Sequence, residues 1–197
     1  VEGSFRYLKR LWRMVWDHVQ QGPVEAVDKS ALNEAERELR RITHRTIAKV
    51  TDDIGRRNTF NTAIASVMEL TNAIARLEDG SAASRAARDE ALRTVVMLLS
   101  PIVPHAGHVL WEALGNDQPV IDAPWPTADA EAMVETEVEY VVQVNGKLRA
   151  RISVAADADR VDIEAKALAD EDARRFMDGK PTKRVIVVPG KLVNIVV

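Results

Sequence analysis

The stretch Val141-Val142-Gln143-Val144-Asn145-Gly146-Lys147-Leu148-Arg149 predicts a β-hairpin in the last third of the chain. β-Branched residues precede an Asn-Gly pair, which favours a tight turn because both residues tolerate a positive φ. A second run of this kind, 185–197, places valine-rich segments on either side of a Pro-Gly pair, and the residues between the two runs have helical character. Residues 138–197 are therefore expected to form a small α+β domain in the order ββααββ.

The register of this hairpin decides where its cations point. A strict two-residue turn would pair Val142 with Arg149 and mix apolar and charged residues on both faces, which conflicts with a buried face. If Gly146 instead occupies the left-handed position of a G1 bulge, Gln143 pairs with Lys147. We predict this bulged register, in which one face is apolar and the other carries Lys147, Arg149 and Arg151. A solvated surface and a phosphate contact explain these cations about equally well.

The first part of the chain, residues 1–116, has the apolar periodicity of four or five amphipathic helices joined by short connections. This pattern predicts an antiparallel helical bundle, so the whole chain is expected to be an α+β multidomain protein. The first helix is expected to face the core with Val1, Phe5, Leu8, Trp12, Val15 and Val19. The second helix, about 31–54, is expected to carry its cations on the solvent side: Arg37, Arg40, Arg41, His44, Arg45 and Lys49.

Residues 117–137 contain three prolines and predict an extended linker between the two domains. Trp125 lies between two of these prolines, and its large apolar surface is expected to pack against the bundle.

Charge is distributed unevenly along the chain. Residues 1–60 hold 12 Lys and Arg against 9 Asp and Glu, residues 61–137 hold 4 against 12, and residues 138–197 hold 11 against 9. A polyanionic partner is therefore expected to bind at the ends of the chain rather than at its middle.

The sequence lacks the residues that several kinds of functional site require. The chain has no cysteine, which excludes disulfides and thiolate metal sites and fits a reducing, cytoplasmic setting. No apolar run is long enough for a membrane span. His105, His108 and Glu112 share a helical face but lack a further ligand nearby in sequence, so we expect no metal site.

Two sequence motifs resemble those of a known protein family. Val142-Gln143-Val144-Asn145-Gly146-Lys147-Leu148-Arg149 and 189–197 closely resemble the C-terminal end of bacterial-type leucyl-tRNA synthetases. Upstream segments, including Leu98–His105 and Ala123–Pro126, are similar to the helical anticodon-binding-type domain of that family. The upstream segments are shared with related synthetases, whereas the two terminal motifs are the specific ones.

The resemblance implies a chain that holds tRNA and lies outside the catalytic and editing domains. The parent would be a monomeric, ATP- and magnesium-dependent leucine–tRNA ligase, while this part would bind no cofactor and catalyse nothing. Its bundle would contact the tRNA body, and residues 138–197 would meet the outer corner near the long variable arm. Transferred by position, the candidate tRNA-binding residues are Arg40, Arg41, His44, Arg45, Arg56, Arg57, Lys147, Arg149, Arg151, Lys183, Arg184 and Lys191. For the cluster at Arg40–Arg45, a solvated face paired with glutamates is the competing interpretation.

A different class of function remains open from the residues alone. The last valine-rich strand could present an exposed edge that adds to the sheet of a partner protein. Such an interaction module would differ from a tRNA-binding domain in its weaker dependence on salt.

Overall fold

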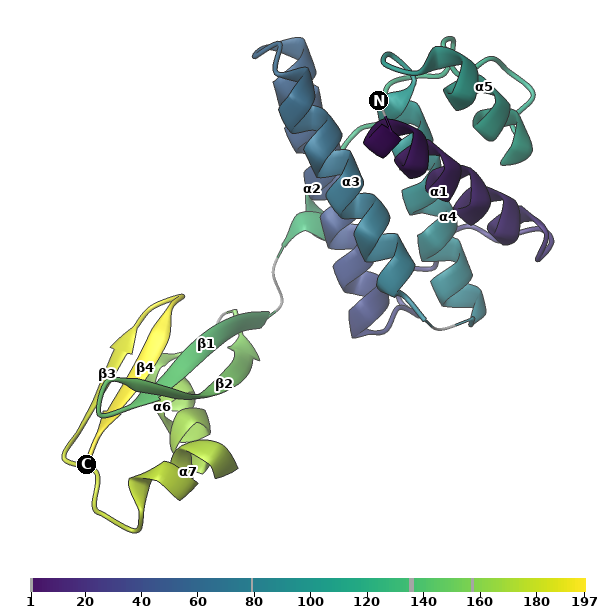
Figure 1. Cartoon of the computed structure of the whole chain (residues 1–197). Helices are drawn as coiled ribbons and strands as arrows, with labels where there is room; N and C mark the ends of the chain where they lie inside the picture. Colours follow the sequence, from purple (N-terminus) through teal and green to yellow (C-terminus); the bar gives the residue numbers. More distant parts are fainter. Residues whose placement is uncertain (1, 79, 135–136, 157) are drawn as a thin grey trace. The chain divides into compact units, whose positions relative to one another are not determined.

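A computed structural model describes residues 2–78, 80–134, 137–156 and 158–197. The chain divides into two compact units, Val1–Val134 and Glu135–Val197. The described residues contain seven α-helices, one 3-10 helix and a four-stranded mixed sheet, so the predicted α+β class is confirmed (Figure 1).

The first unit holds α1 (Glu2–Val19), α2 (Glu34–Gly55), α3 (Phe60–Arg76), α4 (Ala82–Leu99), α5 (Pro104–Ala113) and η1 (Glu131–Met133). The second holds β1 (Glu137–Val144), β2 (Lys147–Ala155), α6 (Arg160–Ala169), α7 (Glu171–Met177), β3 (Arg184–Val188) and β4 (Leu192–Val196).

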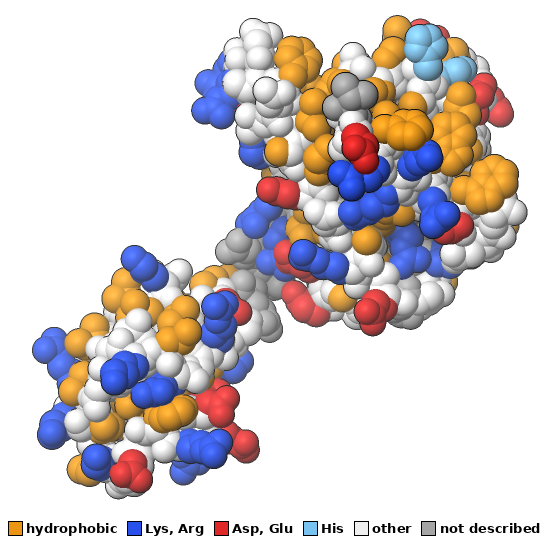
Figure 2. Space-filling model, in the orientation of Figure 1, with side chains coloured by type: hydrophobic (Ala, Val, Ile, Leu, Met, Phe, Trp, Pro, Cys, Tyr) orange, Lys and Arg blue, Asp and Glu red, His pale blue; other side chains and the backbone are white. Residues whose placement is uncertain are grey.

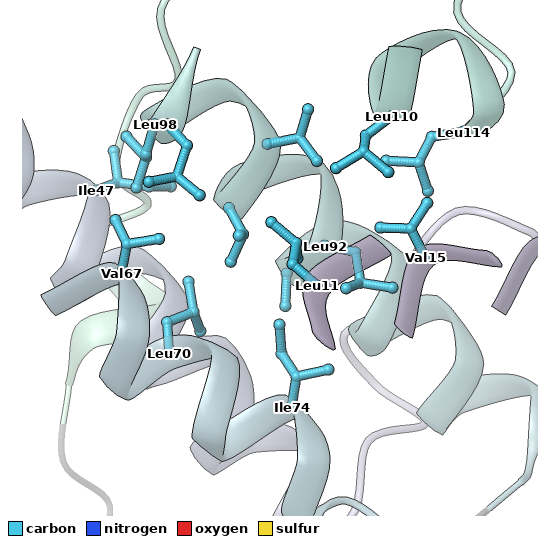
Figure 3. Packing of buried hydrophobic residues seen from close by; sticks show 14 of the residues in the cluster. Leu11, Val15, Ile47, Val67, Leu70, Ile74, Leu92, Leu98, Leu110 and Leu114 are labelled. Atoms are coloured by element: carbon cyan, nitrogen blue, oxygen red, sulfur yellow. The ribbon is translucent and has the colours of Figure 1, made fainter. Parts of the chain in front are cut away.

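The central element of the helical unit is α4, which contacts α1, α2, α3 and α5. Its small residues Ala87 and Ala91 are fully buried, so neighbouring helices can approach closely, while Leu92 and Leu98 fill the space around them. Figure 3 shows leucines, isoleucines and valines from all five helices meeting in one cluster. Because α4 is buried on most sides, it anchors the whole unit.

The core-facing side of α1 differs from the prediction. Phe5 is 56% exposed and Trp12 is 44% exposed, whereas Leu11, Val15 and His18 are buried. The helix carries apolar residues on two sides, and periodicity alone does not say which side meets α4 and α5. Of the predicted core residues, Val15 is buried and Val19 packs against the core, whereas Leu8 is only partly buried and Val1 lies outside the described residues.

In the second unit the strand order is β2-β1-β4-β3, with β1 and β4 parallel and the other pairs antiparallel. Helices α6 and α7 cover one face of this sheet, and Val142, Val193 and Ile195 are buried beneath them. The last strand, β4, is paired on both sides. The prediction that this strand offers an exposed edge is therefore wrong, because β1 occupies the position that a partner strand would need.

The hairpin has a different register from the one we predicted. Val144 pairs with Lys147 across a two-residue turn in which Asn145 and Gly146 both have positive φ, 50° and 76°. The bulge lies further along β2: Gln143 pairs with Leu148 and Val142 with Ala150, which leaves Arg149 as the extra residue. A bulge at this place restores the apolar alternation just as one at Gly146 would, because either shifts the register by one residue.

Candidate nucleic-acid interface

Three predicted contact residues on α2 are buried inside the helical unit. Arg40, Arg41 and His44 are each no more than 7% exposed, so their prediction as solvent-facing residues is wrong. Arg40 Nε donates to Glu90 Oε2 of α4 at 2.7 Å, and His44 Nε2 lies 3.2 Å from Glu90 Oε1. Arg41 lies 2.6 Å from Glu38. Carboxylates already bind these three side chains, so they are poorly placed to meet a phosphate.

The same network reaches the segment that precedes the second unit. The Asp129 main-chain amide donates to His44 Nδ1 at 3.1 Å, which places the ring proton of His44 on Nε2. Asp129 Oδ2 accepts from Lys29 at 2.7 Å and lies 3.6 Å from Arg40. In the same segment Trp125 donates its indole N–H to Thr51 Oγ1 at 2.8 Å, although the ring stays 38% exposed. We call these contacts of Asp129 and Trp125 with α2 and Lys29 the strap contacts.

Ion pairing sets the pKa values in this network. Hydrogen bonding to Lys29 is the main cause that lowers the pKa of Asp129 to about 2. Burial acts to raise the pKa of Glu90, but hydrogen bonds from His44 and Arg40 outweigh it and the pKa is lowered. The hydrogen bond to Glu90 raises the pKa of Arg40. All three groups are therefore charged at neutral pH.

The ion pairs of the Asp129 carboxylate should weaken in acid. Because the pKa of Asp129 is lower in the folded chain than in the unfolded chain, its ion pairs stabilise the fold above about pH 4. This contribution is lost as the pH falls toward 2. We expect the urea midpoint of the wild-type chain to fall more steeply between pH 4 and pH 2 than that of Asp129→Asn, which has no carboxylate to protonate. Parallel pH profiles of the two proteins would contradict this expectation.

Two further candidates, Arg56 and Arg57, follow the end of α2; both are exposed and pair with nearby aspartates. Arg56 Nε donates to Asp52 Oδ1 at 2.6 Å, and Arg57 lies 3.5 Å from Asp53 and 3.6 Å from Asp52. Exposed pairs of this kind contribute little to stability and can exchange partners. These arginines, and the exposed Arg45, remain predictions as RNA contacts.

The hairpin does not present its three cations on one face. The Arg149 guanidinium stacks over the Phe176 ring of α7, 3.9 Å from its centroid, and so belongs to the helix-covered side of the sheet. Arg151 projects from the other face, where its Nη1 donates to Glu139 at 2.8 Å. The predicted grouping of Lys147, Arg149 and Arg151 is therefore wrong, because the bulge turns Arg149 toward α7.

Four candidates of the second unit are exposed and form no ion pair within the described parts of the chain: Lys147, Lys183, Arg184 and Lys191. Figure 2 shows Lys and Arg side chains spread over the visible face of this unit, with fewer acidic side chains between them. These cations are available to an external anion.

Two asparagines that the sequence motifs contain, but that we did not select as site residues, hold this region together. Asn145 Oδ1 accepts from the Val197 amide at 3.2 Å, and Asn194 Oδ1 accepts from the Gly146 amide at 3.0 Å. Each of the two terminal motifs thus supplies one asparagine that bonds to the other motif. The presence of one Asn in each motif was the only signal in the sequence.

None of the helices in the described ranges is long and apolar enough to cross a membrane. Within those ranges no three His, Asp or Glu residues gather as metal ligands. His108 Nε2 lies 3.4 Å from Glu112 Oε1 as a simple surface pair.

The five-helix unit and the cation-bearing sheet unit fit the class of RNA-binding domains. Residues 36–165, which make up most of the chain, match the family described as the anticodon-binding domain of tRNA ligase. The chain belongs to this family.

Curated relatives agree with this assignment. The chain is 61% identical over 196 residues to a leucine–tRNA ligase of Chromohalobacter salexigens and 59% identical over 196 residues to one of Marinobacter nauticus. Each match covers 100% of this chain but 23% of the relative, so the chain spans about a quarter of the length of these proteins. The resemblance to bacterial leucyl-tRNA synthetases that the two terminal motifs indicated is confirmed.

One solved structure is similar to this protein over nearly the whole length of the chain. It is the ternary complex of Agrobacterium radiobacter K84 agnB2 LeuRS with tRNA and LeuAMS. The match has a TM-score of 0.73 and 29% identity, and it covers 99% of this chain and 25% of the other. That synthetase was therefore solved with tRNA bound.

Proposed function

We propose that this chain is the tRNA-holding C-terminal part of a leucine–tRNA ligase. The proposal is carried by the match of the whole chain to about a quarter of the length of leucine–tRNA ligases, together with a similar structure of a synthetase in complex with tRNA. The parent would be a monomeric cytoplasmic enzyme that attaches leucine to its tRNA with ATP and magnesium. Those cofactors and the catalytic step would belong to the parts of the relatives that this chain does not span.

Each unit would have its own task. Residues 1–116 would form an antiparallel bundle of the anticodon-binding type, residues 117–137 a linker, and residues 138–197 a ββααββ tRNA-docking domain. The bundle would lie along the tRNA body, and the docking domain would meet the outer corner near the long variable arm. The strap contacts of Asp129 and Trp125 support a firm attachment of much of the linker to α2.

The candidate contacts differ in how well the structure supports them. The strongest are the exposed cations that form no ion pair with any described residue: Lys147, Lys183, Arg184 and Lys191. Arg45, Arg56, Arg57 and Arg151 come next, because an exposed cation can exchange a surface carboxylate for a phosphate. Arg40, Arg41 and His44 are buried, and Arg149 stacks on Phe176, so these four are not proposed again as contacts.

Binding to tRNA provides the test. We expect the chain to bind a leucine-acceptor tRNA at low salt and to bind the same tRNA without its long variable arm about tenfold more weakly, which is roughly 1.4 kcal/mol. Fluorescence anisotropy of labelled tRNA at 25 to 200 mM salt measures both affinities. Without the catalytic part to fix the acceptor end, the absolute affinity should be modest.

Equal and negligible affinity for both tRNAs at the lowest salt would contradict the proposal. The competing interaction module is not favoured, since β4, the strand whose edge it was expected to use, lies inside the sheet.

A further inference from the structure

Residues 121–133, which we call the strap, are held against α2 mainly by polar contacts. None of these residues is fully buried. Trp125 bonds to Thr51, and Asp129 bonds to His44 about two helical turns earlier on α2. A segment with so little buried apolar surface can separate from its neighbours without unfolding the rest of the unit. The attachment of the strap therefore depends on a small number of hydrogen bonds.

The bond between the strap and His44 requires a neutral imidazole ring. The Asp129 main-chain amide donates to His44 Nδ1 at 3.1 Å, so Nδ1 carries a lone pair and the ring proton lies on Nε2. Nε2 lies 3.2 Å from Glu90 Oε1 and donates to it. A second proton can bind only to Nδ1, where it would face the N–H of Asp129, and two donors cannot bond to each other. Protonation therefore removes the bond to the strap, while the bond to Glu90 remains and becomes charge-assisted.

The other charged groups of this region keep their charge in mild acid. Those that surround the ring or pair with its neighbours are Glu90 of α4, Arg40 of α2, Asp129 and Glu131 of the strap, and Lys29. The pKa of Asp129 is lowered to about 2 and the pKa of Glu90 is also lowered, so both carboxylates are still ionised at about pH 5.5. Hydrogen bonds to carboxylates raise the pKa of Arg40 and of Lys29. Histidine is the side chain that ordinarily changes its charge between about pH 7.5 and about pH 5.5.

We propose that His44 is a proton-controlled switch: its neutral ring holds the strap against α2, and its protonated ring releases residues 128–133. His44 is only 6% exposed, so the proton acts on a ring whose orientation α2 and α4 fix. Release makes η1 part of the connection to β1, which begins at Glu137, instead of part of the helical unit. The inference does not rest on the proposed function, because it concerns contacts within the helical unit.

The test measures amide hydrogen exchange of the 197-residue chain by NMR at about pH 7.5 and about pH 5.5. The protection factor of the Asp129 amide corrects for the intrinsic pH dependence of exchange and reports the bond to His44. The amides of Leu92 and Val95, which are buried in α4, report whether the helical unit stays folded. Imidazole ¹⁵N chemical shifts report the tautomer and the protonation of His44.

The matched variant is His44→Asn. Its side-chain oxygen can accept from the Asp129 amide near the position of Nδ1, and it does not titrate. The other three histidines of the chain are unchanged in this variant, so they cannot explain a difference from the wild type.

We expect the protection factor of the wild-type Asp129 amide to be at least about threefold lower at pH 5.5 than at pH 7.5, as for the loss of one hydrogen bond. It should be the same at both pH values in His44→Asn, and the amides of Leu92 and Val95 should stay protected in both proteins. If the ring is protonated at pH 5.5 and the protection of Asp129 is unchanged, other groups hold the strap and the inference is overturned. A ring that stays neutral at both pH values, or an equal fall in protection in both proteins, also overturns it. If His44→Asn does not fold, the wild-type comparison of ring protonation with strap protection decides the question.

Discussion

Replacing Arg40 by alanine is expected to lower the free energy of unfolding of the helical unit by about 3–5 kcal/mol. The guanidinium is 7% exposed and binds Glu90 Oε2 at 2.7 Å, so its removal leaves the Glu90 carboxylate without its main counter-charge. Asp129 would lose a second cation at 3.6 Å, although Lys29 still binds it. Urea denaturation followed by circular dichroism at 222 nm measures the loss.

A double-mutant cycle isolates the charge pair in this prediction. Arg40→Met with Glu90→Met removes both charges together and should destabilise less than the sum of the single changes, because no unpaired charge stays behind. Arg13→Ala on the exposed side of α1 is the control, with an expected change within about 0.5 kcal/mol. If Arg40→Ala left stability unchanged but weakened tRNA binding, Arg40 would be an RNA contact and our structural assignment would fail.

Replacing Glu36 by alanine is the second change for which we expect a loss of about 3–5 kcal/mol, for a different reason. The side chain is 1% exposed, and its carboxylate accepts from the Asn33 amide at 2.7 Å and from Ser84 Oγ at 2.6 Å. Ser81 Oγ donates to it at 3.3 Å. Since Asn33 caps α2 and Ser81 caps α4, one carboxylate joins the N-terminal ends of both helices.

Thermal and urea unfolding of Glu36→Ala check this expectation. Glu36→Gln has nearly the same shape and keeps one acceptor oxygen, so it should recover much of the loss. Glu69→Ala makes the same change at an exposed site of α3 and should alter stability by no more than about 0.5 kcal/mol. A loss in Glu36→Ala no larger than that in Glu69→Ala would show that the shared cap is unimportant.

Residue types and their spacing predicted much of the fold. Helix periodicity located α2 to within a few residues, at about 31–54 against Glu34–Gly55, because capping residues and glycine end helices by local chemistry. The Asn-Gly pair located the β1–β2 turn because its preference for positive φ is also local. The two terminal motifs indicated the family, and the family match confirms it.

The candidate site was only partly predictable. Lys147, Lys183 and Arg184 are exposed as expected, but the sequence did not show that they lie at one end of a sheet. That juxtaposition depends on the parallel pairing of β1 with β4, whose partners Val144 and Ile195 are 51 residues apart in the chain. Arg40 and His44 were misassigned because the solvent side of α2 was inferred from polarity, whereas Glu90 and Asp129 arrive from distant segments to bind them.

The hairpin separates what the sequence determines from what only the tertiary structure determines. The sequence by itself determined that a strand, an Asn-Gly turn and a second strand with one bulge must follow each other, since apolar alternation cannot continue through the turn without a shift. Tertiary structure alone decided that the bulge lies at Arg149, where the guanidinium stacks on Phe176 of α7. Local geometry allows either bulge, and packing against a helix more than twenty residues away selects one of them.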